Sequence, residues 1–325
     1  MSYKNIYILG VGGSGMSSIA KYLKQKGDNV IGYDQRKSYV TNLLNQDGIK
    51  VVHTLDEITY KPESLYIYSS AIPIESDRFE DFHDKENVLS RPEYLKNLSE
   101  NHKIIGITGT HGKTSTTALL SHIFHFNNVN VSYLYGGITT FNGIGGHYGD
   151  PDQPLILETD EAFNTFEKIK ISDLLVLNVD SDHLDYFKNL DNYKDAFYKV
   201  MKNVTDNLVI NNDDLNIKSM KELKNPVSYG KDIAADFKVQ SPGTFIYENN
   251  KYEIKSDIIG DHFKSNMLGA IILALLNGIE IKDSLNAIES FAGVKRRIEL
   301  IGISKGVLIY DDYGHHPTEM EATIT

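Results

Sequence analysis

Residues 104–124 read "IIGITGTHGKTSTTALLSHIF". An apolar run here leads into a glycine-containing turn and then into a helical pattern. This order predicts a buried strand, a phosphate-binding loop and a helix. The generic loop pattern has glycine at the position of Ile107, so this loop is a variant. Glycines let backbone N–H groups turn toward phosphate, Lys113 can reach the β and γ phosphates, and Thr114 can ligate magnesium. The sequence therefore predicts a nucleotide site here.

The composition is that of a globular protein with more than one domain. Of the 325 residues, 41% are hydrophobic and 24% are charged, and a single core rarely extends over so long a chain. The net charge of −11 argues against a broad nucleic-acid surface, which needs clustered lysine and arginine. The chain has no cysteine, which excludes disulfides and thiolate metal sites and fits a cytoplasmic protein. The longest apolar stretch, 267–276, is about half of a membrane-spanning helix, so we expect no membrane insertion.

A second glycine cluster lies near the N-terminus, in "NIYILGVGGSGMSSIAKYL" (5–23). Gly10, Gly12 and Gly15 follow a strand-like run and precede a helical pattern, which is the spacing of the dinucleotide fingerprint. Asp34, at the end of the next strand-like run, completes that pattern. A nicotinamide oxidoreductase is therefore one hypothesis. A helix N-terminus that binds a different diphosphate is the other.

Alternating strand-like and helical patterns predict an α/β protein. We expect a Rossmann-like N-terminal domain over residues 1–98, followed by a P-loop ATPase-like central domain with a mainly parallel sheet over 99–305. The polar run 96–103 predicts a linker, and the glycine-rich stretch 135–154 predicts a long mobile loop. A strand-like run near the end of the chain suggests the start of a truncated third domain over 306–325.

Three acidic residues stand together in "ETDEAF" (158–163), after another strand-like run. Strand alternation would place Glu158 and Asp160 on one side and Glu161 on the other, so at most two of them converge on a cation. A magnesium site with Glu158 is one interpretation, because this ion prefers carboxylate oxygens and retains water. A solvated turn that caps a helix is the alternative.

Two further segments contain charged or titratable residues that have either a functional or a structural role. His183 in "NVDSDHLDYF" (178–187) follows a strand end, where ligands gather in such folds, although a lone histidine near a helix start is usually structural. Arg296 and Arg297 are either an exposed charged pair or a clamp for a migrating phosphoryl group.

Taken in order, the motifs of the chain resemble the Mur ligase family. They are "GVGGSGMS", "SSAIP", "GTHGKTS", "ETDE", "DHLDYF", "GVKRR" and "DDYGHHPTE", and they extend over essentially the whole chain. The resemblance implies three domains, for a UDP-sugar, for ATP and for an amino acid, of which this chain has only the opening of the third. It also implies an ATP-dependent amide synthesis in peptidoglycan precursor formation. The lactyl carboxylate of UDP-N-acetylmuramate is phosphorylated, and the amine of L-alanine then displaces phosphate.

The resemblance also implies a role for each matched position. Catalysis would involve Lys113, Glu158, His183 and Arg297, and Mg²⁺ would be held by Thr114, Glu158 and His183. The positions implied for ATP are Gly109, Thr110, His111, Gly112, Lys113, Thr114, Ser115, Asn266, Asp312 and His315. The positions implied for the UDP-sugar are Gly12, Gly13, Ser14, Gly15, Met16, Ser17, Asp34, Ser70 and Ala71. The glycines near the N-terminus would then face the diphosphate of the UDP-sugar.

Some positions depart from the family pattern. Ala162 and Phe163 replace the last two residues of its acidic motif, and Phe263 stands where asparagine is common. Asn142 is kept, but the arginine expected soon after it is absent. These departures concern substrate contacts more than ATP binding. The alternatives are a recycling ligase that adds a tripeptide to the same UDP-sugar, or a UDP-sugar-binding module without turnover. Because most of the amino-acid domain is missing, we expect the chain to bind ATP and the UDP-sugar but to turn over slowly or not at all.

Overall fold

The structure is a computed structural model that describes residues 3–182, 184–220, 223–314 and 320–321. The chain divides into two compact units. The first contains residues 1–102, 131–136 and 144–155, and the second contains residues 103–130, 137–143 and 156–325. Each unit is described by itself.

The first unit is built on a parallel sheet. Its strands are β1 (Asn5–Leu9), β2 (Val30–Tyr33), β3 (Lys50–Val52), β4 (Ser64–Tyr68) and β5 (Val88–Ser90). They lie in the order β3-β2-β1-β4-β5, and every pairing is parallel. The order reverses direction between β1 and β4, and ligands of such sheets bind beyond the carboxyl ends of the strands at this point. The predicted Rossmann-like fold is confirmed.

Helices α1 (Ser14–Gln25), α2 (Tyr39–Gln46) and α3 (Arg91–Ser99) belong to the first unit, with short 3-10 turns η1 (Leu55–Glu57) and η2 (Asp77–Phe82). Ser38 and Ser90 begin α2 and α3 with capping boxes, which satisfy backbone N–H groups of the first turn. The predicted linker over 96–103 is wrong in its first half. The last turn of α3 occupies residues 96–99, and Ser99 is buried.

The second unit contains most of a larger sheet. Its strands are β6 (Ile104–Thr108), β7 (Ser132–Thr139), β8 (Gly143–His147), β9 (Leu155–Glu158), β10 (Asp173–Val176), β11 (Asn207–Asn211), β12 (Val227–Gly230), β13 (Phe237–Ser241), β14 (Thr244–Tyr247) and β15 (Asn250–Glu253). Their order is β15-β14-β13-β12-β11-β10-β6-β9-β7-β8. From β6 through β10, β11 and β12 to β13 the pairings are parallel, and β13, β14 and β15 are antiparallel. The predicted mainly parallel sheet is confirmed.

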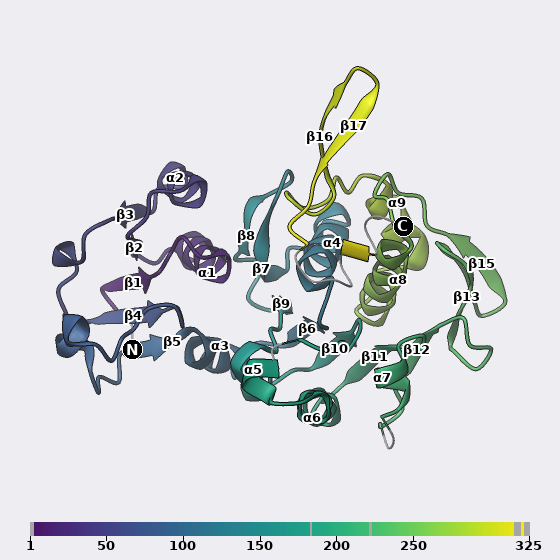
Figure 1. Cartoon of the computed structure of the whole chain (residues 1–325), viewed down its shortest axis with the longest axis horizontal. Helices are drawn as coiled ribbons and strands as arrows, with labels where there is room; N and C mark the ends of the chain where they lie inside the picture. Colours follow the sequence, from purple (N-terminus) through teal and green to yellow (C-terminus); the bar gives the residue numbers. More distant parts are fainter. Residues whose placement is uncertain (1–2, 183, 221–222, 315–319, 322–325) are drawn as a thin grey trace. The chain divides into compact units, whose positions relative to one another are not determined.

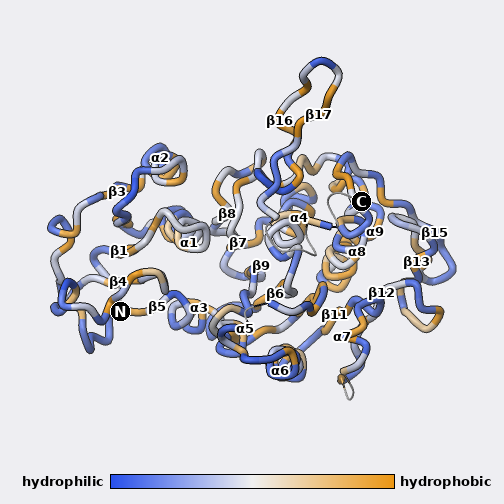
Figure 2. The backbone as a smooth tube through the Cα atoms, viewed as in Figure 1, coloured by the Kyte–Doolittle hydropathy of each residue, from blue (hydrophilic) through white to orange (hydrophobic). Residues whose placement is uncertain are grey.

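Helices of the second unit cover both faces of this sheet (Figure 1). They are α4 (Lys113–Phe126), α5 (Leu184–Phe187), α6 (Leu190–Lys202), α7 (Leu215–Lys218), α8 (Asp261–Leu276) and α9 (Ile281–Glu289), with 3-10 turns η3 (Ala162–Asn164) and η4 (Phe166–Lys168). Helices α4 and α8 pack together on one face, and α6 lies on the other. Hydrophobic residues run along α8 (Figure 2), and its residues 266–274 are buried. Among the described residues, no helix is long and apolar enough to span a membrane.

The glycine-rich stretch 135–154 is not the long mobile loop that the sequence predicts. It contains most of β7 and all of β8, and its residues 144–147 belong to the first unit together with α1. A Cβ on Gly146 would overlap the backbone of Ser18 in α1, and Lys21 of α1 donates to the Ile144 carbonyl at 3.2 Å. Glycine therefore serves close packing against α1 here, rather than flexibility.

The last described strands form a hairpin, β16 (Glu299–Ser304) with β17 (Val307–Asp311). The predicted strand near the end of the chain is β17. This hairpin contains hydrophobic residues (Figure 2). Their side chains are exposed, with Ile303 at 67% and Val307 at 63%.

Candidate functional site

The first glycine loop connects β1 to α1. Gly10 has a φ of +80°, and the N–H of Gly12 donates to Oδ2 of Asp34 at 2.8 Å. A Cβ on Gly12 would lie 2.6 Å from that carboxylate oxygen, so a side chain there would displace the Asp34 carboxylate. The other oxygen of Asp34 accepts from the Arg36 N–H at 3.0 Å. The Asp34 carboxylate therefore fixes the loop backbone from the end of β2.

The start of α1 offers backbone N–H groups. Ser14 and Gly15 are its first two residues, and the N–H groups of a first helical turn have no partner within the helix. The helix N-terminus also carries a partial positive charge, which favours an anion. The side chains of two predicted contact residues, Met16 and Ser17, are buried. Met16 is 2% exposed in the core, and the buried hydroxyl of Ser17 donates to the Ser14 carbonyl at 2.9 Å.

A cation that the sequence analysis missed lies at this helix start. Arg91, the first residue of α3, places its guanidinium against Gly15, so that a Cβ there would lie 2.8 Å from the Arg91 Nε. That Nε is buried, and no described atom accepts a hydrogen bond from it. Arg91 is distant from the glycines in sequence, so no motif pointed to it.

The predicted contacts Ser70 and Ala71 lie in an exposed turn after β4. Because β1 and β4 are parallel neighbours, this turn and the first glycine loop share one edge of the sheet. Ser69 approaches Gly10 closely, since a Cβ on Gly10 would lie 3.0 Å from the Ser69 Cβ. The structure therefore brings the predicted glycines, Asp34 and the turn together within the first unit.

The second glycine loop connects β6 to α4 and is clamped by Asn178. The Asn178 side chain accepts from the His111 N–H at 2.8 Å and donates to the His111 carbonyl at 3.0 Å. The Asn178 carbonyl accepts from the Thr110 N–H at 3.2 Å. Gly112 has a φ of +83°, and a Cβ on it would overlap the side-chain amide of Asn266. One position that favours glycine and three hydrogen bonds to Asn178 thus shape the predicted phosphate loop.

Thr114 and Glu158, two of the predicted magnesium ligands, lie in direct contact. The Thr114 hydroxyl donates to Oε1 of Glu158 at 2.8 Å, at the end of β9. A hydroxyl and a carboxylate side by side suit Mg²⁺, which takes few protein ligands and keeps several waters. Among the described residues, no group of three or more His, Asp or Glu side chains could hold a metal ion. These two residues therefore fit a magnesium ion whose other ligands are water and phosphate.

Lys113 is held by a residue that the sequence analysis placed elsewhere. Its ammonium donates to the carbonyls of Gly109 and Thr110 at 2.7 and 3.1 Å and to the Glu161 carboxylate at 2.9 Å. The strand ends at Glu158, so alternation does not extend to Glu161, and a turn directs this carboxylate inward. Burial alone would lower the pKa of Lys113, but the carboxylates of Glu161, Asp160 and Glu158 raise it above its ordinary value.

One cavity of about 430 Å³ joins predicted residues from separate segments of the second unit. It is lined by His111, Gly112 and Ser115 of the phosphate loop and the start of α4, by Asn266 of α8, and by Arg297 and Asp312. Arg297 and Arg296 differ. Arg297 lines this cavity, whereas Arg296 is exposed and pairs with Asp311 at 3.5 Å. Two of the predicted residues, His183 and His315, lie outside the described residues.

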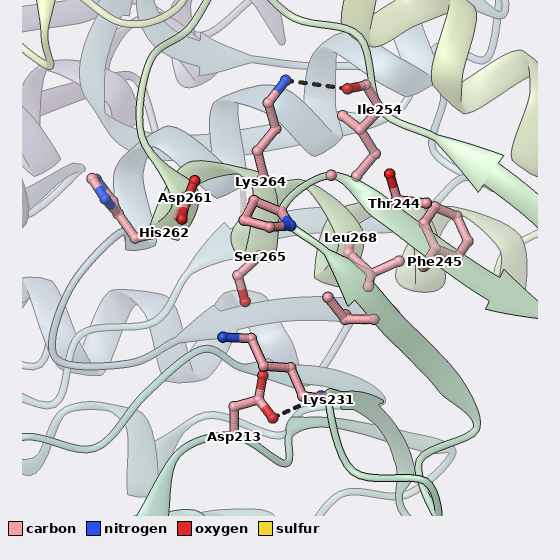
Figure 3. A pocket seen from close by; sticks show the side chains of 13 residues that line it. Asp213, Lys231, Thr244, Phe245, Ile254, Asp261, His262, Lys264, Ser265 and Leu268 are labelled. Atoms are coloured by element: carbon pink, nitrogen blue, oxygen red, sulfur yellow. Dashed lines mark hydrogen bonds between the residues drawn. The ribbon is translucent and has the colours of Figure 1, made fainter.

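A smaller pocket of about 210 Å³ adjoins this cavity and shares Asp213 and His262 with it (Figure 3). Two of its polar side chains, those of Lys264 and Asp213, form hydrogen bonds within the second unit. Lys264 donates to the Ile254 carbonyl at 3.2 Å, and the Lys231 N–H donates to Asp213 at 2.8 Å. None of the predicted site residues lines this pocket. The larger cavity is therefore the candidate nucleotide site.

Comparison with known families matches both units. The Mur ligase family catalytic domain matches residues 5–103, and the Mur ligase middle domain matches residues 107–274. These ranges contain both glycine loops. A match of this kind leaves no support for the nicotinamide oxidoreductase hypothesis, and the glycine fingerprint near the N-terminus belongs to a ligase family instead.

Individual relatives agree with the family match. UDP-N-acetylmuramate–L-alanine ligase of Cytophaga hutchinsonii is 32% identical over 98% of this chain and 73% of its own length. The ligase of the same name from Clostridium botulinum is 35% identical over 99% of this chain and 73% of its own length. The solved structure of UDP-N-acetylmuramate-alanine ligase from Thermotoga maritima has a TM-score of 0.83 at 26% identity, and the match covers 98% of this chain and 76% of that one. The chain therefore belongs to the Mur ligase family of ATP-dependent ligases.

Proposed function

We propose that the chain acts as the ATP- and UDP-sugar-binding part of a ligase that joins L-alanine to the lactyl carboxylate of UDP-N-acetylmuramate. Support comes from relatives of that name at 32% and 35% identity. One structural observation carries the proposal furthest. Predicted ATP residues from the phosphate loop, from α8 and from the segment near Asp312 line one cavity in the second unit.

ATP would bind at the second glycine loop. The β and γ phosphates would meet the N-terminus of α4 and the ammonium of Lys113, and the nucleoside would lie toward Asn266 and Asp312 in the cavity. One Mg²⁺ ion, held by Thr114 and Glu158, would neutralise charge on the phosphates. The resemblance implies a second Mg²⁺ ion, which His183 would ligate or orient. Phosphoryl transfer needs such alignment and charge neutralisation more than a covalent catalyst.

UDP-N-acetylmuramate would place its diphosphate on the N-terminus of α1. The N–H groups of Ser14 and Gly15 and the guanidinium of Arg91 would donate to the phosphate oxygens. Arginine suits this position because its planar fork can contact two phosphate oxygens. We assign UDP-N-acetylmuramate to the predicted N-terminal domain, residues 1–98, and ATP to the predicted central domain, residues 99–305.

The proposed reaction has two steps. The lactyl carboxylate attacks the γ phosphorus of ATP to give an acyl phosphate and ADP, and the amine of L-alanine then attacks the acyl carbon and releases phosphate and a proton. Arg297, which lines the cavity beside Asn266, would stabilise the transferring phosphoryl group. A cytoplasmic location, where both nucleotides are available, is part of this proposal.

The recycling ligase stays an alternative that substrate choice can test. The solved UDP-N-acetylmuramate:L-alanyl-gamma-D-glutamyl-meso-diaminopimelate ligase from Neisseria meningitides shares the fold of this chain, with a TM-score of 0.77 at 22% identity. The assay measures phosphate release from ATP in the protein that carries this chain, with UDP-N-acetylmuramate and either L-alanine or the tripeptide of that relative. Release with L-alanine alone supports the proposal, and release with the tripeptide alone contradicts it.

Binding gives a second test that does not depend on turnover. Calorimetric titration with UDP-N-acetylmuramate should show binding, and UDP-N-acetylglucosamine, which lacks the lactyl carboxylate, is the matched control. Absence of binding by UDP-N-acetylmuramate would refute the proposed substrate.

A further inference from the structure

All three N–H donors of the Lys113 ammonium group have acceptors among the described residues. An ammonium group has three N–H donors. Within the described residues, they face the Gly109 carbonyl at 2.7 Å, the Thr110 carbonyl at 3.1 Å and Glu161, whose two carboxylate oxygens both lie 2.9 Å from the nitrogen. A phosphate oxygen can therefore receive a hydrogen bond from Lys113 only if one of these contacts is given up.

Of these three contacts, the one between Lys113 and Glu161 costs the most free energy to break. Its side chain is 1% exposed, and a buried carboxylate without a counter-charge costs several kcal/mol. The turn that carries Glu161 is fixed by the Phe166 N–H, which donates to the Asp160 carbonyl, and by the Asn164 N–H, which donates to the Glu161 carbonyl. The loop carbonyls are neutral, so their contacts with the ammonium are weaker than that of the carboxylate.

Tyr193 extends the same network. Its hydroxyl lies 3.0 Å from the Thr110 hydroxyl, and Tyr193 is completely buried. The Thr110 hydroxyl also accepts from the Asp180 N–H at 2.8 Å. Thr110, whose carbonyl accepts from Lys113, is therefore held by the loop after β10 and by α6.

We propose that Glu161 is a positioning residue for Lys113, and that it offsets the charge of the ammonium and thereby sets the affinity of the loop for nucleotide phosphates. When phosphate binds, the ammonium keeps its contact with Glu161 and gives up a loop carbonyl. The inference rests on the proposed ATP site at this loop. It goes beyond the predicted role of Lys113, because it assigns a function to a carboxylate that is not among the predicted site residues.

Two substitutions separate charge from position. Glu161→Gln keeps the shape and an oxygen acceptor for Lys113 but removes the negative charge. We expect its dissociation constant for the ATP analogue adenylyl imidodiphosphate, measured by calorimetry with Mg²⁺, to fall about tenfold, because a nearby unit charge no longer opposes the phosphates. Glu161→Asp keeps the charge, so its dissociation constant should stay within about twofold of the wild-type value. Such a return toward wild type with the conservative variant is not expected of a merely structural role.

Glu167→Gln is the matched control. It removes the same charge from a carboxylate of the second unit that is 26% exposed and lies 3.9 Å from Lys199. We expect no change in nucleotide affinity for this variant. An unchanged or weaker affinity in folded Glu161→Gln would overturn the inference.

A structure of the wild-type protein with the same analogue tests the inference without any substitution. It should show Lys113 within hydrogen-bond distance of both Glu161 and a phosphate oxygen, with one loop carbonyl released. An ammonium that has left Glu161 contradicts the inference. Failure of the wild-type protein to bind the analogue would instead contradict the proposed ATP site, so the two outcomes are distinguishable.

Discussion

Both glycine loops follow a buried strand and open a helix, α1 after β1 and α4 after β6. In the first loop, the Asp34 carboxylate binds the backbone of Gly12, and the cation Arg91 comes from another helix. In the second loop, the cation Lys113 is the first residue of the helix itself, and a buried carboxylate holds it. The same strand–loop–helix arrangement thus receives its positive charge from a different helix in the first unit, and from the helix that follows the loop in the second unit.

The two loops differ in how many of their contacts come from residues nearby in sequence. The second loop carries its lysine, its glycines and its magnesium candidate Thr114 within a few residues, so a motif describes most of it. The first loop depends on residues brought in by β2 and α3. We therefore expect damage to the second loop to affect both folding and ligand binding, and damage around the first loop to affect chiefly the binding of its ligand.

The largest expected effect is that of Lys113→Met. Removing one partner of a buried ion pair leaves Glu161 without its counter-charge, and we expect the free energy of unfolding to fall by about 3–5 kcal/mol. Urea unfolding at neutral pH measures this loss. Lys199→Met is the control, since Lys199 is exposed and lies 3.9 Å from Glu167. Adding Glu161→Gln to Lys113→Met should restore most of the stability, and a double variant as unstable as the single one would contradict the account.

Gly112→Ala should come next. Its φ of +83° disfavours a side chain, and a Cβ would overlap the amide of the buried Asn266. We expect a loss of about 2–3 kcal/mol in unfolding free energy from strain and overlap together, with loss of ATP binding. Gly27→Ala has a similar φ of +99° but nothing within 4 Å of its Cβ, so it isolates the backbone cost. Equal losses in the two variants would show that the approach of Asn266 does not matter.

A smaller effect is expected for Arg91→Gln in the first unit. Loss of one charge-assisted contact should weaken binding of UDP-N-acetylmuramate about tenfold, while ATP binding stays unchanged. Calorimetric titration measures both ligands in one preparation. The exposed Arg78 serves as the control for removal of an arginine charge from the same unit. Equal weakening in Arg78→Gln would mean that the position of Arg91 is irrelevant.

The smallest effect concerns pH and His122 of α4. Burial lowers the pKa of His122 below the ordinary 6.5, although its bond to the Ala287 carbonyl opposes this. Below pH 6.5 the unfolded chain binds a proton there that the folded protein does not, so stability falls as the pH decreases. We expect a loss of about 1 kcal/mol between pH 7.5 and 5.5 from this group. Urea unfolding of His122→Gln, which cannot titrate, should show a smaller loss; an identical pH dependence would contradict the assignment.

Much of this comparison was predictable from the sequence, because apolar runs, glycines and the lysine of the second loop are local signals. The parallel strands, both loops and the pair of Thr114 with Glu158 follow from such signals. Two kinds of feature did not. Arg91 and Asn178 reach their loops through the fold, and their sequence neighbours carry no sign of it.

The other errors came from patterns extended too far. Alternation predicted that Glu161 faces away from Glu158, but the strand ends at Glu158 and a turn reverses the expected direction. Glycines over 135–154 predicted a loop, whereas Gly146 allows β8 to approach the backbone of α1. Which of several reasons a glycine serves is a property of its neighbours in space, so the sequence could not decide it.

The central claim is that the two glycine loops bind two different ligands. The most direct test is calorimetric titration of the wild-type chain with ATP in the presence of Mg²⁺, alone and after saturation with UDP-N-acetylmuramate. The account predicts one equivalent of each ligand, with ATP binding retained in the saturated protein. Displacement of one ligand by the other, which would place both at a single loop, would contradict it.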